Sequence, residues 1–274
     1  MTAHPNRRDF VKTLALGAGT ALASSTRSEA RPVGANDRLG IGMIGLGRMA
    51  RGHLENLLAE PDVEVRALCD VYETNLRFAA TKAPEATTHG DFREVLGRDD
   101  IDAVVIATPD HWHALPTVMA CDAGKDVYVE KPDAHNILEG RTMVAAARKH
   151  GRVVQLGTQG RSGEVQRSAM KYIAAGNLGK VRFAKAWESS RQGSIGHPPD
   201  GDPPPGVDYD MWLGPAPKRP FNIRRFHGSW RWFFDYGTGD LGNDGVHLLD
   251  FARWGLETAV AAGGEQIPDV PRAV

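Results

Sequence analysis

The stretch "IGMIGLGRMARGH", residues 41–53, leads from an apolar run through a Gly-x-Gly-x-x-Ala pattern into a basic, helix-like segment. In a strand–turn–helix unit, Gly45 would permit a tight turn, and Gly47 would let backbone N–H groups approach a pyrophosphate. Ala50 is small enough for the helix to pack on the sheet. The same pattern also occurs in glycine-rich loops after strands, so the neighbouring segments decide between the two interpretations.

Short apolar, β-branched runs alternate with amphipathic stretches from residue 38 to residue 158. Such alternation is typical of buried parallel strands joined by crossover helices. We therefore predict an α/β domain of the Rossmann type, with a doubly wound parallel sheet. The predicted strands are 39–45, 63–70, 102–108, 126–131 and 153–158, and the predicted helices are 49–58, one from 73 onward, 113–124 and 137–151.

Asp70 ends the second predicted strand. A carboxylate at this place can accept hydrogen bonds from the adenosine ribose hydroxyls of a dinucleotide. It would repel a 2′-phosphate, and residues 71–73 (Val-Tyr-Glu) supply no cation to bind one. With the glycine turn, Asp70 predicts a site that takes NAD in preference to NADP. Arg48 and Met49, at the start of the first helix, are predicted cofactor contacts as well.

Two later strands end in "ATPDHWHALP" and "VYVEKPDA", at the carboxyl edge of the sheet where such folds bind ligands. Lys131 follows a buried strand and is predicted to face the crevice that receives the nicotinamide, although a surface lysine after a strand would have the same spacing. His111 and His113 have no carboxylate or thiol at metal-ligand spacing, so we predict no metal site.

The motifs "GLGRMARGH", "ATPDHWHA", "EKP" and "GNDGVHLLD" together resemble the glucose-fructose oxidoreductase, inositol dehydrogenase and MocA family, from residue 38 to about residue 260. The resemblance implies an NAD(P)-dependent oxidoreductase that acts on a CH–OH group of a sugar, polyol or related secondary alcohol. It also implies a second domain of α+β type, with an open, mostly antiparallel sheet that forms the substrate pocket.

The resemblance assigns roles to residues at matching positions of this sequence. The glycine turn and Asp70 would contact pyrophosphate and adenosine, a second group would line the nicotinamide side, and Lys131 would lie beside the reacting carbinol. His247 would bind the substrate hydroxyl and move its proton. The nicotinamide-side residues implied in this way are Thr108, Pro109, His113, Glu130 and Lys131.

The sequence departs from the family at the position four residues before His247, where the family has Asp and this chain has Asn243. An amide cannot stabilise an imidazolium as a carboxylate does. Asp244, three residues before His247, would lie close to it on a helix and is the candidate substitute. The changed pair leaves reaction direction and type open.

The second half, residues 159–274, is predicted to form the substrate and oligomerisation domain. A helix over 164–176 leads to a strand within 178–190, and a Pro- and Gly-rich loop and a helix over 244–256 follow. Trp212, Trp230 and Trp232 could stack on a sugar or anchor the loop to the core. Few residues then remain for strands, so we expect a domain truncated at its C-terminus. The resemblance suggests a homo-oligomer.

The N-terminus carries Arg7 and Arg8 before a short, weakly apolar run and small residues. This order is typical of a Tat-type signal peptide over residues 1–30, and predicts interaction with the Tat machinery and a periplasmic mature protein without a membrane span. The net charge of -1 gives no electrostatic argument for nucleic acid. Cys69 and Cys121 lack metal-ligand spacing and are expected to be buried.

Three functional hypotheses follow. The first is an exported NAD-dependent oxidoreductase, with Lys131 and His247 moving protons. The second is a glycoside hydrolase or lyase that uses NAD for transient oxidation and releases no net NADH. The third is a non-catalytic dinucleotide-binding fragment, which the substitution at Asn243 favours.

Overall fold

The computed structural model describes residues 38–189 and 192–264. The predicted signal peptide therefore lies outside the described residues. The predicted tail beyond residue 264 does so as well.

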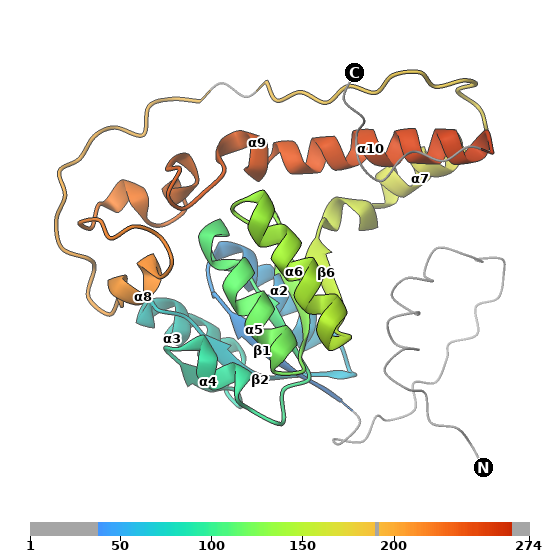
Figure 1. The fold of residues 1–274 in the computed structure, drawn as a ribbon. Coiled ribbons are helices and arrows are strands. Elements are labelled where there is room, and N and C mark those ends of the chain that lie inside the picture. The colour runs from blue at the N-terminus through green and yellow to red at the C-terminus, as the bar shows by residue number, and fades with distance from the viewer. Residues whose placement is uncertain (1–37, 190–191, 265–274) are drawn as a thin grey trace, which may run out of the picture. The chain divides into compact units, whose positions relative to one another are not determined.

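A six-stranded parallel sheet forms the first half of the chain (Figure 1). Its strand order is β3-β2-β1-β4-β5-β6, so the chain winds outward from β1 in both directions. This order confirms the predicted doubly wound domain. The strands are β1 (Leu39–Ile44), β2 (Val63–Cys69), β3 (Thr87–His89), β4 (Ala103–Ile106), β5 (Asp126–Glu130) and β6 (Val154–Gly157).

Helices cover both faces of this sheet. On one face, α2 (Arg48–Ala59) and α3 (Glu73–Lys82) bury Leu54 and Ala79 against β1 and β2. On the other, α4 (Phe92–Leu96), α5 (Ala114–Asp122) and α6 (Ile137–His150) join a core with β4 and β5. Cys69 and Cys121 are both buried and free. Because the strands are apolar on both faces, the two layers hold the sheet between them.

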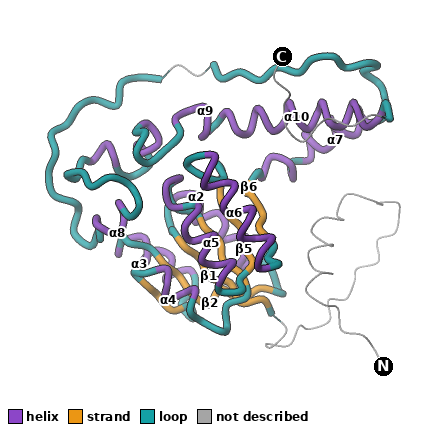
Figure 2. The backbone as a smooth tube through the Cα atoms, viewed as in Figure 1, coloured by secondary structure: helices purple, strands orange, loops and turns teal. Residues whose placement is uncertain are grey.

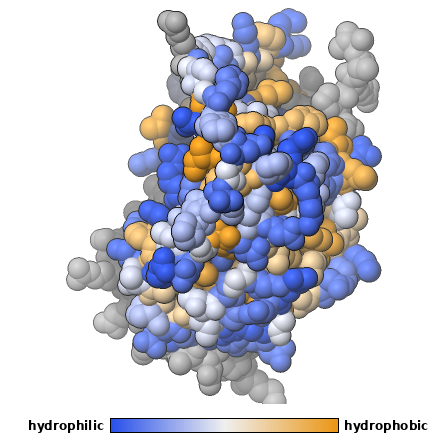
Figure 3. Space-filling view, turned by 90° about the vertical axis from the view of Figure 1, so that its left-hand side faces the viewer, coloured by the Kyte–Doolittle hydropathy of each residue, from blue (hydrophilic) through white to orange (hydrophobic). Residues whose placement is uncertain are grey.

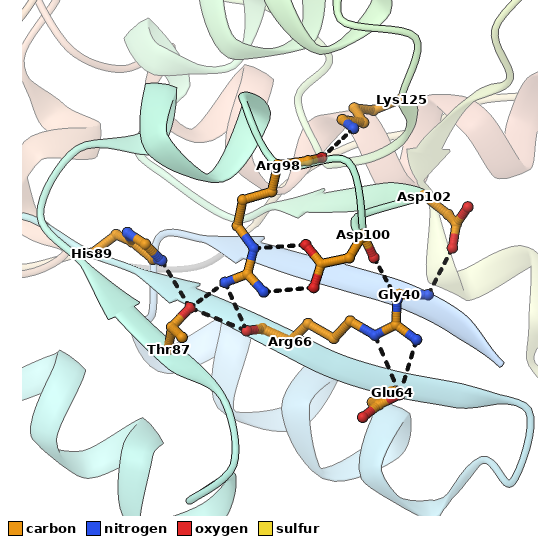
Figure 4. Close-up of polar contacts among 9 residues, drawn as sticks. All are labelled: Gly40, Glu64, Arg66, Thr87, His89, Arg98, Asp100, Asp102 and Lys125. Atoms are coloured by element: carbon orange, nitrogen blue, oxygen red, sulfur yellow. Dashed lines mark hydrogen bonds and ion pairs between the residues drawn. The ribbon is translucent and has the colours of Figure 1, made fainter. Parts of the chain in front are cut away.

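The amino-terminal edge of the sheet is tied together by polar contacts (Figure 4). The Arg98 guanidinium donates to both carboxylate oxygens of Asp100 at 2.8 and 2.7 Å. Arg66 Nη1 donates to the Asp100 carbonyl at 2.6 Å, and Lys125 Nζ donates to the Arg98 carbonyl at 2.6 Å. These bonds fix the loop before β4 at the amino-terminal edge. Ligands of such folds bind at the opposite, carboxyl edge of the sheet.

The second half contains helices and loops in its described part. Its helices are α7 (Glu164–Ala174), α8 (Tyr209–Leu213), α9 (Gly239–Asn243) and α10 (Gly245–Ala262). Helices α7 and α10 lie side by side (Figure 1). The helix predicted over 244–256 continues to Ala262.

The predicted strand within 178–190 and the antiparallel sheet are not observed among the described residues; residues 179–189 form an extended loop (Figure 2). Phe183 and Trp187 are exposed there. The strand prediction was wrong because its alternation of apolar and polar residues is weak. No neighbouring strand lies along it in the described part of the chain, so its backbone gains no ladder of hydrogen bonds.

A largely aromatic cluster in α8 and the loop after it attaches the second half to the sheet. Its core consists of Trp212, Leu213, Phe221, Phe226, Trp230 and Tyr236. The Trp212 carbonyl accepts hydrogen bonds from His111 Nε2 at 3.0 Å and Trp112 Nε1 at 2.9 Å. Burial lowers the pKa of His111 to about 4, so this imidazole is neutral near pH 7.

Arg161, after β6, fixes α10 through a bidentate pair with Asp250. Its Nε and Nη2 donate to the two carboxylate oxygens at 2.8 and 2.7 Å, and its guanidinium lies 5.2 Å from the Trp254 ring centre.

One face of the molecule shows small apolar patches among hydrophilic side chains (Figure 3). No helix in the described ranges combines the length and apolar character needed to cross a membrane.

Candidate active site

A cavity of about 900 Å³ lies at the carboxyl edge of the sheet and draws residues from both halves of the chain. Its size is that of a site for a small molecule or cofactor. All but one of the residues predicted to bind the cofactor line it. From the first half these are Gly45, Gly47, Arg48, Met49, Asp70, Thr108, Pro109, Glu130 and Lys131; the second half contributes residues including Trp212, Trp230, Arg231, Asn243 and Asp244.

Gly45 and Gly47 differ in how much room a side chain would have at each position. Gly45 has a φ of +82°, and an added Cβ would lie 2.8 Å from the backbone of Ala107 and Thr108. At Gly47 an added Cβ would meet no atom within 4 Å, so this position is open. Helix α2 begins directly after Gly47, has no side-chain cap and has no acidic residue in its first turn. Its first N–H groups are therefore available to an anion in the cavity.

Asp70 is fixed at the end of β2 by three hydrogen bonds. Its Oδ2 accepts from the Leu46 N–H at 2.7 Å and from Asn75 Nδ2 at 3.1 Å, and its Oδ1 accepts from the Tyr72 N–H at 2.8 Å. Burial raises the pKa of Asp70, while these bonds act in the opposite direction. Since each carboxylate oxygen has two lone pairs, Oδ1 can still accept a hydrogen bond from a ligand hydroxyl.

Lys131 reaches across the cavity to Asn243. Its Nζ donates to the Asn243 carbonyl at 2.8 Å and to Asn243 Oδ1 at 3.0 Å. The same Oδ1 accepts from Arg231 Nε at 2.9 Å. Burial lowers the pKa of Lys131, and the nearby charge of Arg231 lowers it further, against the opposite effect of three carboxylates. Asn243 thus places a neutral acceptor between two basic groups.

His247 lies in the first turn of α10, near Lys131 but not on the cavity lining. Burial lowers its pKa, and the charge of Lys131 adds to the effect. Asp244, the candidate partner of His247, accepts from Asn243 Nδ2 through its Oδ1 at 3.1 Å, and its charge raises the pKa of His247. The spacing argument placed both on one helix, whereas Asp244 is the cap before α10 begins.

His113 is the predicted cofactor contact that the cavity does not include. It is fully buried, with Nδ1 2.6 Å from the Pro132 carbonyl and Nε2 2.9 Å from the Thr108 carbonyl. It therefore joins the loops after β4 and β5 from behind the cavity. Thr108 lines the cavity, and its buried Oγ1 has no hydrogen-bond partner among the described residues.

Asp110 and His53 are two polar residues near this site that were not predicted. Asp110 is buried and accepts from Thr238 Oγ1 at 2.9 Å, and burial raises its pKa. Glu130 was predicted. Its Oε1 lies 2.7 Å from Nε2 of His53, a residue of α2. The placement of Asp110 directly after the fourth strand was the signal that could have identified it, whereas nothing in the sequence connects His53 with Glu130.

The tryptophans lie between the loop and the cavity. Trp212 and Trp230 are buried in the aromatic cluster, which anchors the loop, and also line the cavity, and Trp232 lines it with 37% exposure; stacking on a sugar stays a prediction. No group of three potential metal ligands occurs in the described part of the chain. The uncapped start of α2, the open position at Gly47 and the fixed Asp70 together fit a dinucleotide.

Two stretches of the chain match one oxidoreductase family. Residues 39–158 match its NAD-binding Rossmann fold, and residues 183–260 match its C-terminal alpha/beta domain. The chain belongs to the glucose-fructose oxidoreductase, inositol dehydrogenase and MocA family. The Rossmann match covers the glycine turn, Asp70 and Lys131, and the second covers Arg231 and Asn243.

Known relatives of this family member match about half of it. A glycosyl hydrolase family 109 protein of Shewanella pealeana is 31% identical over 53% of this chain and 37% of its own length. A 1-carboxy-3-chloro-3,4-dihydroxycyclohexa-1,5-diene dehydrogenase of Comamonas testosteroni is 32% identical over 52% and 36%. The crystal structure of scyllo-inositol dehydrogenase from Lactobacillus casei with NAD(H) and scyllo-inositol is 28% identical, with a TM-score of 0.50 over 52% and 42%. The chain thus spans less than half the length of these relatives.

Proposed function

We propose that this protein is an NAD-dependent dehydrogenase that oxidises a secondary hydroxyl group of a sugar or polyol. The observation that carries the proposal is the placement of Lys131 Nζ, 2.8 and 3.0 Å from two acceptors of Asn243, in the cavity that also contains the glycine turn and Asp70. The family membership and the inositol dehydrogenase relative support the same chemistry.

The contacts of Lys131 suit a base. A neutral amine has two N–H bonds and one lone pair. With both N–H bonds donated to Asn243, the lone pair is left to take the proton of a substrate hydroxyl. A lysine with a lowered pKa can do so nearer neutral pH. When bound, the nicotinamide supplies the carbon that accepts the hydride. His247 is the candidate that receives the proton afterwards.

The preference for NAD over NADP is supported by the acidic surroundings of Asp70. A smaller hollow that includes Asp70 is also lined by Glu73, Asp91, Glu94 and Asp208, with no lysine or arginine on its lining. Arg77 and Arg93 pair with Glu73 and Asp91, whereas Asp70 forms no ion pair with a described residue, so a 2′-phosphate beside Asp70 would meet its negative charge. Binding titrations with NADH and NADPH test this preference.

Turnover tests the reaction itself. The protein is incubated with NAD and a panel of sugars and polyols, and NADH is followed by absorbance. Lys131→Met should abolish NADH formation and retain NADH binding, because the amine acts on the substrate. A Lys131→Met variant with unchanged turnover would refute the proposed base.

A second candidate function is glycoside hydrolysis through transient oxidation, which the family 109 relative favours. In that reaction the cofactor is reduced and then reoxidised on the same substrate, so free sugar forms without net NADH. Product analysis on glycosides without added NAD separates it from the dehydrogenase.

We also propose export to the periplasm through the Tat pathway, on the evidence of Arg7 and Arg8 before the apolar run. Because that pathway carries folded proteins, a cofactor bound in the cytoplasm would travel with the protein. Replacing both arginines by lysine should stop export, as measured by fractionation. Undiminished delivery to the periplasm would contradict the proposal.

A further inference from the structure

Arg231 is a cation in the cavity that forms no ion pair with any residue the structure describes. It is half-buried, and its Nε and Nη1 donate to uncharged acceptors, Asn243 Oδ1 at 2.9 Å and the Gly228 carbonyl at 3.0 Å. Its guanidinium lies 4.3 Å from the centre of the Trp230 ring, which fixes its plane. Three of its five N–H donors remain available on a cavity-lining group.

Several other half-buried arginines in the described part of the chain have carboxylate partners, whereas Arg152 donates to the His150 and Gly124 carbonyls at 3.1 and 3.0 Å, away from the cavity. Arg66, Arg98 and Arg225 have side chains 21 to 23% exposed, and each lies within 3.1 Å of a carboxylate oxygen. Placing a charge out of water is costly unless an opposite charge accompanies it. Arg231 departs from this pattern at the position where ligands bind.

No carboxylate among the described residues forms an ion pair with Arg231. Burial lowers its pKa and the charges of Asp110 and Asp244 raise it, but the hydrogen bonds of these two carboxylates are to the Thr238 hydroxyl and the Asn243 amide. The residue that bridges Lys131 and Arg231 is Asn243, which carries no charge. The substrate end of the cavity therefore has a guanidinium with donors left for a ligand.

We propose that Arg231 binds a carboxylate of the substrate, so that this enzyme oxidises a sugar acid in preference to a neutral sugar. The inference rests on the proposed dehydrogenase function and narrows its substrate class. A single carboxylate matches the planar guanidinium and its one unpaired charge. A phosphate would bring a second negative charge close to Asp110 and Asp244.

Binding tests this assignment independently of turnover. Isothermal titration of the full-length protein, loaded with NADH, compares glucuronate and gluconate with glucose and sorbitol. We expect the better acid to bind at least about tenfold more tightly than its neutral counterpart, as charge-assisted hydrogen bonds to a partly desolvated arginine allow. Comparing the affinities of glucuronate and gluconate shows which end of the sugar carries the carboxylate that the site binds. Equal affinity for acids and neutral sugars would overturn the proposal, as would tighter binding of glucose 6-phosphate.

Variants locate the effect. Arg231→Gln should reduce the ratio of acid to neutral affinity to about one, Arg231→Lys should retain part of it, and Arg219→Gln should leave it unchanged. Arg219 is the matched control because it pairs with Asp235 and does not line the cavity. If Arg231→Gln weakens NADH binding and leaves the ratio intact, the guanidinium serves the cofactor and the proposal is wrong. If acids bind preferentially but no substrate is oxidised, the dehydrogenase function fails and the carboxylate site stands.

Discussion

Asn243→Asp would place a negative charge between Lys131 and Arg231. Its Oδ1 position lies 3.0 Å from Lys131 Nζ and 2.9 Å from Arg231 Nε. At 3 Å two unit charges attract by roughly 5 kcal/mol at an effective dielectric constant of about 20. Because Arg231 shares the carboxylate and solvent reaches the half-buried lysine, we expect the pKa of Lys131 to rise by about 1–2 units, within the usual effect of one neighbouring opposite charge.

The direction of the pH effect follows from the role of Lys131 as a base. The base acts in its neutral form, so a higher pKa moves the acidic limb of the kcat/KM profile to higher pH by the same 1–2 units, roughly. The assay is NADH formation across pH with saturating NAD. Asn177→Asp, at an exposed amide bonded to the Tyr172 carbonyl, is the matched control for the added charge. A limb that stays in place or moves to lower pH would show that Lys131 is not the titrating group.

Three further predictions concern the turn, the cofactor and α10. Gly45→Ala should lower the free energy of unfolding by roughly 1–3 kcal/mol, because its φ of +82° and the 2.8 Å approach to backbone exclude a side chain. Gly47→Ala, the matched substitution in open space, should leave Tm unchanged and weaken NADH binding; an equal loss of Tm in both variants would contradict this. Asp70→Asn should reduce the preference for NADH over NADPH at least about tenfold in titrations, and an unchanged ratio would remove Asp70 as its cause. Arg161→Gln should lower stability by about 1 kcal/mol or less and reduce kcat by displacing α10. If this pair holds α10, the double variant Arg161→Gln/Asp250→Asn should lose little more stability and activity than Arg161→Gln does by itself, as measured by thermal unfolding and turnover.

The strands and long helices of the first half could be predicted because each is a run of one periodicity. The short elements β3 and α4 could not be predicted, because segments of 3 and 5 residues are too short to show a periodic pattern of apolar residues. In the second half α7 and α10 were predicted as helices, whereas the predicted strand is a loop. Strand formation depends on a neighbouring strand, which is a property of the whole sheet.

The candidate site divides in the same way. Gly45, Asp70 and Lys131 could be assigned to one place because the carboxyl ends of parallel strands meet at one edge of the sheet. The position of Arg231 depends on how the aromatic cluster docks more than a hundred residues after the glycine turn, and local sequence carries no signal of that contact. His113 stays a prediction as a cofactor contact; in the structure both of its ring nitrogens face backbone carbonyls of the loops after β4 and β5.

The segment after residue 200 meets the sheet beside the adenosine end of the cavity. The Gly206 carbonyl accepts from the Glu73 N–H at 2.8 Å, and the Asp208 N–H donates to the Val71 carbonyl at 2.8 Å. Phe226 and His227, farther along, line the same cavity as Gly47 and Asp70. A dinucleotide bound in this cavity would contact residues of both halves, and these two backbone bonds hold the halves together beside Asp70. We therefore expect a longer residence time for the cofactor than the sheet half would give by itself.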